Sequence, residues 1–361
     1  MQSNGHYRLD GDSLVFSDEA TDEDLAVLDS LPQLKSIGFS RGPNVRPPIR
    51  VTAAGLAHLA SVKELEKLVL SGVPLTDAGL APVATLHGLR ELWLDGNEQL
   101  TDAALEHVAG LTKLRVLRFF KTPLTDDGLL RIRNLLLLEN LQLGYAQITD
   151  ATAATIMRFT ELRTLDLQHT GITNAGLASL RGMTKLRWVA VRETAVSDLA
   201  PLAGLAELEW LTADHTAVND ASLAHLARLA RLHDVDLSST KVTDAGLPQL
   251  ARLPRLERLK LDALPISDAG LKTVSAAGGL VSLDLNGTKV TDAGLPSLAQ
   301  LSKLAHLGLD DCAIGDQGLA VLASLKSLKS VSLANTRITR AAYDATQKAH
   351  PDLGLWNLTP R

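Results

Sequence analysis

The sequence has one cysteine, Cys312, few aromatic residues and no long hydrophobic run. One thiol can form neither an internal disulfide framework nor a multi-cysteine zinc site, and it fits a reducing compartment. Aromatic residues make up 3% of the chain and hydrophobic residues 45%, so a core must be aliphatic. No apolar run reaches the ~18 residues that a membrane span needs, and the first residues lack the features of a signal peptide. We expect a cytoplasmic protein without a membrane segment; secretion of a trimmed form stays open.

The chain also lacks an excess of positive charge and the short motifs of common enzymes. Its formal net charge is -5, whereas a general nucleic-acid binder needs a basic stripe that displaces counterions from phosphates. The sequence contains no HExxH, GxSxG or Walker A run, and its ten histidines are scattered. We therefore predict a protein that is not an enzyme, has no cofactor or metal, and does not bind nucleic acid or a membrane.

What the sequence does contain is a repeat. A Thr/Ser-Asp-Ala-Gly-Leu-like segment recurs, and ten of the thirteen intervals between its copies are 24 residues long. The copies begin at Thr21, Thr52, Thr76, Thr101, Thr125, Thr149, Thr173, Ser197, Asn219, Thr243, Ser267, Thr291, Gly315 and Thr339. Repeats of this length indicate a solenoid, in which each unit buries its apolar side against its neighbours.

Each unit combines two apolar periods. In residues 291–314, Leu295 and Leu298 have helical spacing, whereas Leu307 and Leu309 alternate with other residues as in a strand. The Thr or Ser is expected to cap the helix, and the following Asp to lie at the positive end of its dipole. Glycine inside a helix costs ~1 kcal/mol relative to alanine, so its recurrence predicts close approach between neighbouring units. A column of short polar residues, mostly threonine and including Asn97 and Cys312, is expected to bond the backbone between units.

The pattern TDAGLxxLAxLxxLxxLxLxxTxV resembles the leucine-rich-repeat family, in particular its bacterial, cysteine-type members with helical repeats. This resemblance implies an α/β fold: a right-handed solenoid, or horseshoe, with a parallel β-sheet on the concave face and short helices on the convex face. One 22-residue unit, starting at Ser197, resembles the internalin type, in which a tighter turn replaces the α-helix; we expect a local change of curvature there. Members of the family mostly act as protein-recognition scaffolds, which is analogy and not a property of these residues.

The expected organisation is an N-terminal cap over residues 1–20, a solenoid of about 13 repeats over residues 21–340, and a C-terminal capping coil over residues 341–361. A small hairpin is expected at Tyr7–Leu9 and Leu14–Phe16. Residues 41–48 have the composition of a loop, either a tolerated insertion or a rim loop that contacts a partner. At the other end, Leu353, Leu355 and Trp356 are expected to cover the last core face.

The strand positions between the leucines should point out of the concave face. Three of the four tryptophans, Trp93, Trp188 and Trp210, fall at such positions, and an exposed tryptophan on a rigid surface is an expected binding hot spot. Trp188 and Trp210 occupy the same position on adjacent units, so their rings should be in contact range. The alternative is that they shield each other. Further along the chain this face becomes acidic, which would attract a basic segment or serve only as a solvated polar surface.

The resulting function hypothesis is a monomeric scaffold that binds a protein or peptide, possibly basic, on its concave face. The alternatives are a substrate-recognition adaptor of a larger complex and a binder of carbohydrate or a cell-surface ligand. His169 and His215 are two units apart, ~10 Å by strand spacing, too far to share a metal ion. The predicted partner-binding residues are Trp93, Asp95, Arg118, Phe120, Gln142, Asp166, Gln168, Trp188, Arg192, Trp210, Asp214, Asp236, Lys260 and Asp284.

Overall fold

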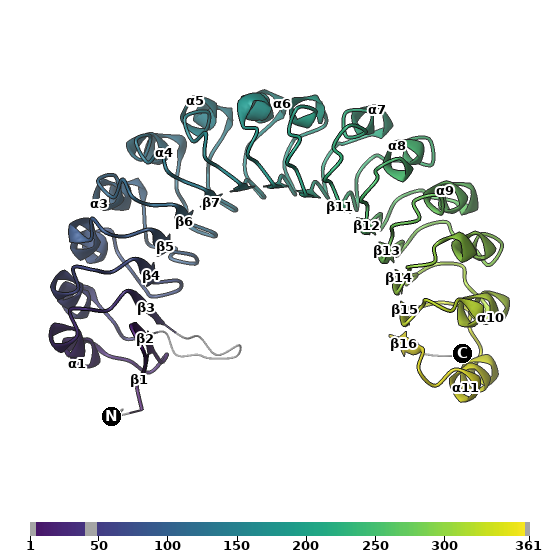
Figure 1. The fold of residues 1–361 in the computed structure, drawn as a ribbon, viewed down its shortest axis with the longest axis horizontal. Coiled ribbons are helices and arrows are strands. Elements are labelled where there is room, and N and C mark those ends of the chain that lie inside the picture. The colour runs from purple at the N-terminus through teal and green to yellow at the C-terminus, as the bar shows by residue number, and fades with distance from the viewer. Residues whose placement is uncertain (1–4, 40–48, 358–361) are drawn as a thin grey trace. The chain divides into compact units, whose positions relative to one another are not determined.

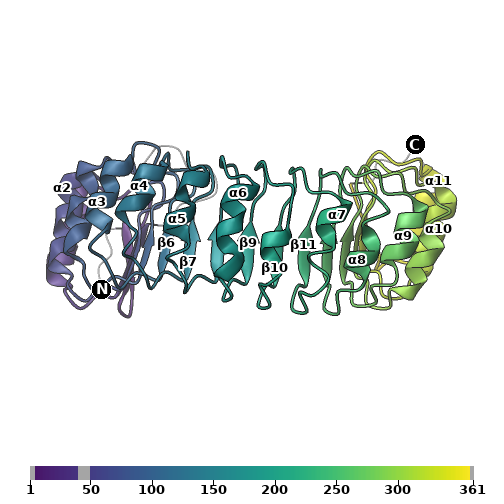
Figure 2. The ribbon, with the colours of Figure 1, turned by 90° about the horizontal axis from the view of Figure 1, so that it is seen from above.

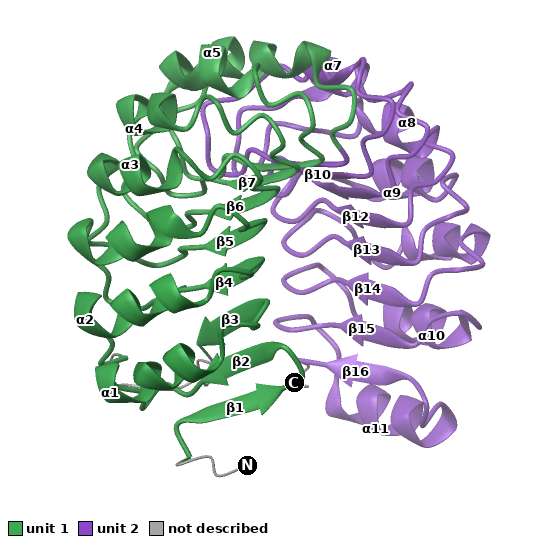
Figure 3. Cartoon of the chain, turned by 60° about the vertical axis from the view of Figure 1, so that its left-hand side comes forward, with its two compact units in different colours: residues 1–186 green, residues 187–361 purple. Residues whose placement is uncertain are grey.

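The computed structural model describes residues 5–39 and 49–357. The chain divides into two compact units, Met1–Leu186 and Arg187–Arg361 (Figure 3). Within each unit the strands line the inner, concave side and the helices lie on the outer side (Figure 1). The helices follow one another in chain order along the outside of each unit (Figure 2). No helix in the described part of the chain is long and apolar enough to cross a membrane.

The first unit contains an eight-stranded sheet that is parallel from β2 onward, and β1 pairs antiparallel with β2. Its strands are β1 (Tyr7–Asp10), β2 (Ser13–Phe16), β3 (Ser36–Phe39), β4 (Lys67–Val69), β5 (Glu91–Trp93), β6 (Val116–Arg118), β7 (Asn140–Gln142) and β8 (Thr164–Asp166). Its α-helices are α1 (Asp22–Leu25), α2 (Ala53–Leu56), α3 (Leu105–Val108), α4 (Asp126–Arg131), α5 (Ala153–Ile156) and α6 (Asn174–Leu177). Its 3-10 helices are η1 (Ala26–Ser30), η2 (Ala57–Ser61), η3 (Ala78–Thr85), η4 (Asp102–Ala104), η5 (Asp150–Thr152) and η6 (Ala178–Gly182).

The second unit contains eight parallel strands in chain order. They are β9 (Trp188–Ala190), β10 (Trp210–Thr212), β11 (Asp234–Asp236), β12 (Arg258–Lys260), β13 (Ser282–Asp284), β14 (His306–Gly308), β15 (Ser330–Ser332) and β16 (Gly354–Trp356). The helical segments are η7 (Ala200–Leu202), α7 (Asp220–Leu223), α8 (Leu247–Ala251), α9 (Asp268–Val274), η8 (Leu295–Gln300), α10 (Asp316–Ser324) and α11 (Arg340–Ala349). The α/β solenoid architecture expected from the repeat is confirmed in each unit.

Leucine ladders form the core. The central residue of each strand is an apolar side chain that pairs in register with its equivalent on the next strand, as Leu92 does with Leu117 and Leu259 with Leu283. These side chains are at most 1% exposed. The short polar column also has the expected role: Thr216 donates its hydroxyl to the carbonyl of Ala213 at 2.6 Å, and Asn97 bonds the carbonyls of Leu70 and Leu94.

The repeated aspartate joins each repeat to the next one. In the second unit the Asp268 carboxylate accepts hydrogen bonds from the backbone N–H and the hydroxyl of Thr291, at 2.8 and 2.7 Å. The same arrangement links Asp22 to Thr52, Asp77 to Thr101, Asp102 to Thr125, Asp126 to Thr149, Asp150 to Thr173, Asp220 to Thr243, Asp244 to Ser267 and Asp316 to Thr339. The expectation from the helix dipole was incomplete, because this carboxylate contacts the following repeat directly.

The recurring glycine is explained by the same contact. A Cβ atom added at Gly270 would lie 2.1 Å from Oδ1 of Asp244, and one added at Gly294 would lie 2.4 Å from Oδ1 of Asp268. Real Cβ atoms do not approach other atoms so closely, so glycine leaves the room into which the preceding aspartate packs. The predicted close approach between repeats is therefore confirmed, and its partner is a carboxylate.

This ladder predicts the effect of Asp150→Asn. Burial raises the pKa of Asp150, but hydrogen bonds from the Thr173 hydroxyl, the Thr173 N–H and the Gly176 N–H outweigh it and leave that pKa below 3.8. The ionised group therefore stabilises the fold above pH 3.8, and this contribution is lost as the pH falls through the lowered pKa. Allowing for partial exposure, Asp150→Asn should cost about 1–2 kcal/mol at pH 7, and the difference from wild type should shrink below pH 3.8.

Urea unfolding at several pH values measures both effects. Asp127→Asn is the matched control, because Asp127 is exposed in the first turn of α4, and it should change the free energy of unfolding by no more than a few tenths of a kcal/mol. Equal effects of the two substitutions would contradict the inter-repeat role of the aspartate.

Both ends of the chain are only partly as expected. The predicted N-terminal hairpin is confirmed as β1–β2. At the C-terminus Leu353 is 7% exposed and covers the core, but Trp356 is 63% exposed, so the expectation that it covers the last core face is wrong. Residues 41–48, interpreted as an insertion or a rim loop, lie outside the described residues.

Candidate functional site

The candidate site is the inner surface of each sheet. Each repeat contributes three side chains here, which we call the first, second and third positions; in β10 and the residues after it they are Trp210, Thr212 and Asp214. The residues between them, Leu211 and Ala213, are buried in the core. Most strands show this alternation, with half-buried residues on either side of a buried one. The predicted assignment of outward and inward positions is thus confirmed, and it leaves three side chains per repeat that the core does not use.

In the first unit Trp93 lies between two cations. The Lys67 ammonium is 4.6 Å and the Arg118 guanidinium 4.2 Å from the centre of its ring, and Arg118 also pairs with Asp95 at 2.7 Å. The indole Nε1 is buried and has no hydrogen-bond partner among the described residues. Trp93 is therefore a half-buried member of a cation–π cluster, not the freely exposed anchor that its position suggested.

A second cluster lies along the ends of the neighbouring strands. The Phe120 ring meets Tyr145 edge-on at 5.1 Å between centroids, and Tyr145 stacks on His169 at 3.9 Å. Lys121 reaches both Phe120 and Tyr145 with its ammonium group, at 5.7 and 5.2 Å from the ring centres. Tyr145 is 38% exposed, so this aromatic row is open to solvent at its centre.

Asp166 is less available than its position predicted. Its side chain accepts hydrogen bonds from the backbone N–H and the amide of Gln168, at 3.0 and 2.9 Å, and it is only 2% exposed. Burial raises the pKa of Asp166, against the effect of the hydrogen bonds from Gln168. The expected exposed carboxylate is therefore wrong here, because Gln168 covers it. Gln142 keeps a half-exposed place at the second position of β7.

In the second unit Trp188 and Trp210 are direct neighbours in register on β9 and β10. Both are half-buried at first positions. The predicted ring contact between them is absent from the aromatic pairs of the described residues, and Trp210 instead meets His233 edge-on at 4.7 Å. The second positions beside them carry only Ala190 and Thr212, so no large side chain separates the tryptophans from the third positions.

The third positions next to these tryptophans hold an ion pair. Arg192 contacts Asp214 at 3.2 Å, and His215 Nδ1 lies 2.9 Å from the same carboxylate. Asp214 is 3% exposed, so the prediction that it is an accessible partner contact is wrong. Its Oδ1 atom is nevertheless without a hydrogen-bond partner among the described residues.

Beyond β10 the inner surface is acidic, and its cations are already paired. Arg258 contacts Asp234 at 2.6 Å and Lys260 contacts Asp236 at 3.9 Å. Asp284 makes no ion pair or hydrogen bond within the described part of the chain. Burial is the largest cause that raises the pKa of Asp284, and repulsion from Asp262 and Asp236 raises it further. The negative charge at Asp262 and Asp284 is thus only partly compensated.

The fourth tryptophan was not recognised from the sequence as part of this surface. Trp356 occupies the second position of β16, in register with Ser332, so all four tryptophans of the chain lie at first or second positions. A signal existed, since Leu353 and Leu355 continue the strand spacing, but the absence of a following repeat hid it.

Comparison with known proteins gives the family of the chain. The sequence profile described as leucine-rich repeat region matches residues 73–345. The chain belongs to the leucine-rich-repeat family. No curated protein sequence matches it.

Solved structures of leucine-rich-repeat proteins share the fold. An internalin from Listeria monocytogenes is 21% identical, with a TM-score of 0.58 over 90% of this chain and 87% of that one. A leucine-rich-repeat protein from Leptospira interrogans is 17% identical, with a TM-score of 0.63 over 91% of this chain and 85% of that one. Both are bacterial proteins, as the resemblance in the repeats suggested. Leucine-rich repeats commonly act as scaffolds for protein–protein interaction.

The leucine-rich repeat of 22 residues differs locally from its neighbours. Its helical segment is η7, a three-residue 3-10 helix that contains Pro201, and the Asp198 side chain accepts the backbone N–H of Ala200 at 2.8 Å. The expected replacement of the α-helix by a tighter turn is confirmed. The change of curvature at this repeat stays a prediction.

The leucine-rich-repeat surface offers little for catalysis or metal binding. No group of three or more His, Cys, Asp or Glu side chains in the described ranges could hold a metal ion. Cys312 is 3% exposed, and burial raises the pKa of its thiol, although hydrogen bonds involving Thr288 act against this. A buried thiol that resists ionisation is a poor nucleophile.

Proposed function

We propose that this protein binds a protein or peptide partner on its inner surface and that it acts by binding, not by catalysis. The observation that carries the proposal is the pair Trp188 and Trp210, held in register on adjacent strands at positions that the core does not need. Two half-exposed indoles on a rigid sheet offer a large apolar contact at low entropic cost. Small neighbours at the second positions, Ala190 and Thr212, leave the ring faces on that side without a bulky competitor.

The proposed contact extends from the tryptophans to the acidic strands β11 to β13. Lys260 and Arg258 are already engaged with carboxylates, whereas Asp284 has no cationic partner and Asp262 has only a distant one in Lys260. A lysine or arginine of a partner would supply the missing charge and would be steered to this surface at low ionic strength. We therefore propose a partner segment with an apolar anchor followed by basic residues.

Carbohydrate binding is the second candidate function. Tryptophan rings beside polar side chains such as Thr212 also suit a sugar ring. A glycan array separates the two, because a glycan ligand would bind there without any protein partner. Recognition of a substrate for a larger complex would use the same surface, and the experiments below do not depend on which assembly it serves.

Site-specific photo-crosslinking tests the proposed surface. A crosslinking residue at Thr212, in the proposed contact, should capture the partner, and one at Met157, 57% exposed and directly after α5, should not. Capture only from Met157 would show that the outer side carries the interaction and would overturn the proposal.

The acidic surface also predicts a stability effect that needs no partner. Because the folded protein holds Asp284 with a raised pKa, its ionised form destabilises the fold at neutral pH. Asp284→Asn should therefore raise the free energy of unfolding at pH 7 by about 0.5–2 kcal/mol. This gain should shrink as the pH falls through the raised pKa, where wild-type Asp284 becomes neutral as well.

Urea unfolding of the two proteins at pH 7 and at acidic pH measures this difference, and the same variant should bind a basic partner more weakly. Asp311→Asn, at an exposed residue just outside the inner surface, is the matched control. A loss of stability in Asp284→Asn at pH 7 would mean that Asp284 is needed by the fold and is not held for a partner.

A further inference from the structure

The first strand of the sheet has a free edge. Strand β1 pairs only with β2, and the backbone N–H of Ser17 donates to the carbonyl of His6 at 2.7 Å. In an antiparallel pair the residues alternate between facing the partner strand and facing away. His6, Arg8 and Asp10 therefore bond toward β2, and the peptide groups of Tyr7 and Leu9 point to the free edge. No strand among residues 5–39 and 49–357 pairs with them.

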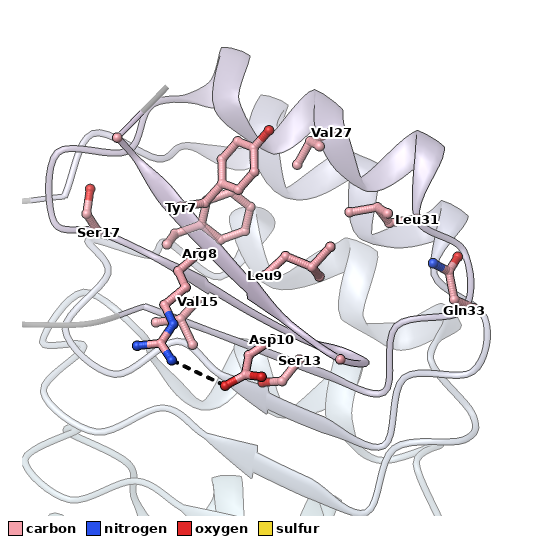
Figure 4. Close-up of a pocket in the computed structure, with 13 residues that line it drawn as sticks. Tyr7, Arg8, Leu9, Asp10, Ser13, Val15, Ser17, Val27, Leu31 and Gln33 are labelled. Carbon is pink, nitrogen blue, oxygen red and sulfur yellow. Dashed lines mark hydrogen bonds and ion pairs between the residues drawn. The ribbon is translucent and has the colours of Figure 1, made fainter. Parts of the chain in front are cut away.

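This edge also has an uncovered apolar side. Tyr7 and Leu9 line a pocket of ≈ 1310 Å³ between the hairpin and η1, together with Val27 and Leu31 (Figure 4). The other side of β1 carries charge: Arg8 and Asp10 are 82% and 78% exposed at their side chains and contact each other at 3.3 Å. The strand thus presents free hydrogen-bonding groups, apolar side chains toward the pocket and one charge of each sign on the opposite side.

We propose that β1 pairs with β1 of a second copy of this chain, antiparallel and with Leu9 opposite Leu9. Both peptide groups of Leu9 face the free edge, so two Leu9 residues opposite each other would exchange two backbone hydrogen bonds. The two pockets would adjoin across the twofold axis, and Tyr7 and Leu9 of each copy would be covered by those of the other. This replaces the monomer expected from the sequence and is independent of the function proposed for the inner surface.

Charge selects this register. Three twofold registers bring outward-facing peptide groups opposite each other, centred on Leu9, on Arg8 or on Tyr7. The register centred on Arg8 would place the two Arg8 guanidinium groups opposite each other, and like charges in that relation destabilise a pair of strands. The register centred on Tyr7 would leave Asp10 beyond the pairing. Only the register centred on Leu9 places Arg8 of each copy opposite Asp10 of the other.

Charges on an edge strand usually prevent unwanted pairing. Here the two charges are of opposite sign and two residues apart, so they exclude the other registers and favour this one. The ion pairs are exposed and provide specificity more than affinity. The affinity would come from the backbone hydrogen bonds and the burial of Tyr7 and Leu9.

Charge exchange between the two positions tests this interface. Sedimentation equilibrium of the full chain should give a concentration-dependent dimer, and R8D or D10R alone should weaken it at least about tenfold, because each places like charges opposite each other. An equal mixture of R8D and D10R should form the heterodimer, and R8D/D10R should dimerise as wild type does. Circular dichroism checks that all variants are folded.

The proposal is overturned if the wild-type chain stays monomeric at its highest soluble concentration or if R8D dimerises as tightly as wild type. It is overturned as well if both single variants are monomeric and their mixture does not associate, since the register then differs. Because the inner-surface experiments use residues on other strands, their failure would leave this result unaffected.

Discussion

Gly270→Ala is expected to destabilise the second unit by about 2–4 kcal/mol, far more than a glycine-to-alanine change in a helix normally would. Alanine is the better helix former by ~1 kcal/mol, so propensity alone predicts a gain. The added Cβ would, however, lie 2.1 Å from the Asp244 carboxylate oxygen. The carboxylate must move, and it then loses its hydrogen bonds to the backbone and hydroxyl of Ser267.

Urea unfolding of the variant measures this cost, and Gly278→Ala is the matched control. A Cβ atom at Gly278 would meet nothing within 4 Å, so this variant should stay close to wild type. Asp244→Ala removes both the hydrogen bonds and the obstacle. The double variant should therefore cost clearly less than the sum of the two single changes, and additive effects would show that the glycine has another purpose.

Loss of both indoles at Trp188 and Trp210 should weaken partner binding at least about 30-fold, which corresponds to 2 kcal/mol for a hot spot. The fold should tolerate the change, because both side chains are half-buried on the inner surface and lie outside the leucine ladders. Titration calorimetry with the captured partner gives the affinities of wild type, Trp188→Ala, Trp210→Ala and the double variant.

Trp356→Ala is the matched control for this series. It removes the same side chain from the same kind of surface, but from β16 at the C-terminal end of the unit. We expect its affinity to stay within a few-fold of wild type. Equal losses at all three tryptophans would indicate a general apolar surface, and unchanged affinity in the double variant would remove these residues from the site.

The fold could be predicted because period and spacing report directly on the covalent chain. A two-residue period in the strands and a helical period after the threonine determine which side chains face the core, and neither depends on distant contacts. The repeat length then brings equivalent residues into register. Pairings such as Trp188 with Trp210 followed from this arithmetic alone.

The depth of each inner-surface residue could not be predicted in the same way. Period two shows on which side Asp166 and Asp214 lie, but their exposure depends on how Gln168 and Arg192 fold back over them. The third-position turn adds a further effect: the residue after it has a positive φ in repeat after repeat, for example 69° at Tyr145 and 56° at Ala263. Because these residues are not glycines, no sequence signal announced this conformation, which places Tyr145 against Phe120 and His169.

The contacts between repeats were also only half visible. The glycine signalled close approach, but the sequence could not show that the approaching group is the aspartate of the preceding repeat, which lies 26 residues before Gly270 in the case of Asp244. The edge of β1 was equally hidden, since which peptide groups are free depends on the pairing within the hairpin.

Hydroxyl-radical footprinting of the protein with and without its partner tests the central claim most directly, because it reads the solvent access of individual side chains. If the inner surface binds the partner, oxidation of Trp188 and Trp210 should fall on binding, while oxidation of Met157 on the outer side stays the same. Protection of Met157 with unchanged oxidation of both tryptophans would contradict the account.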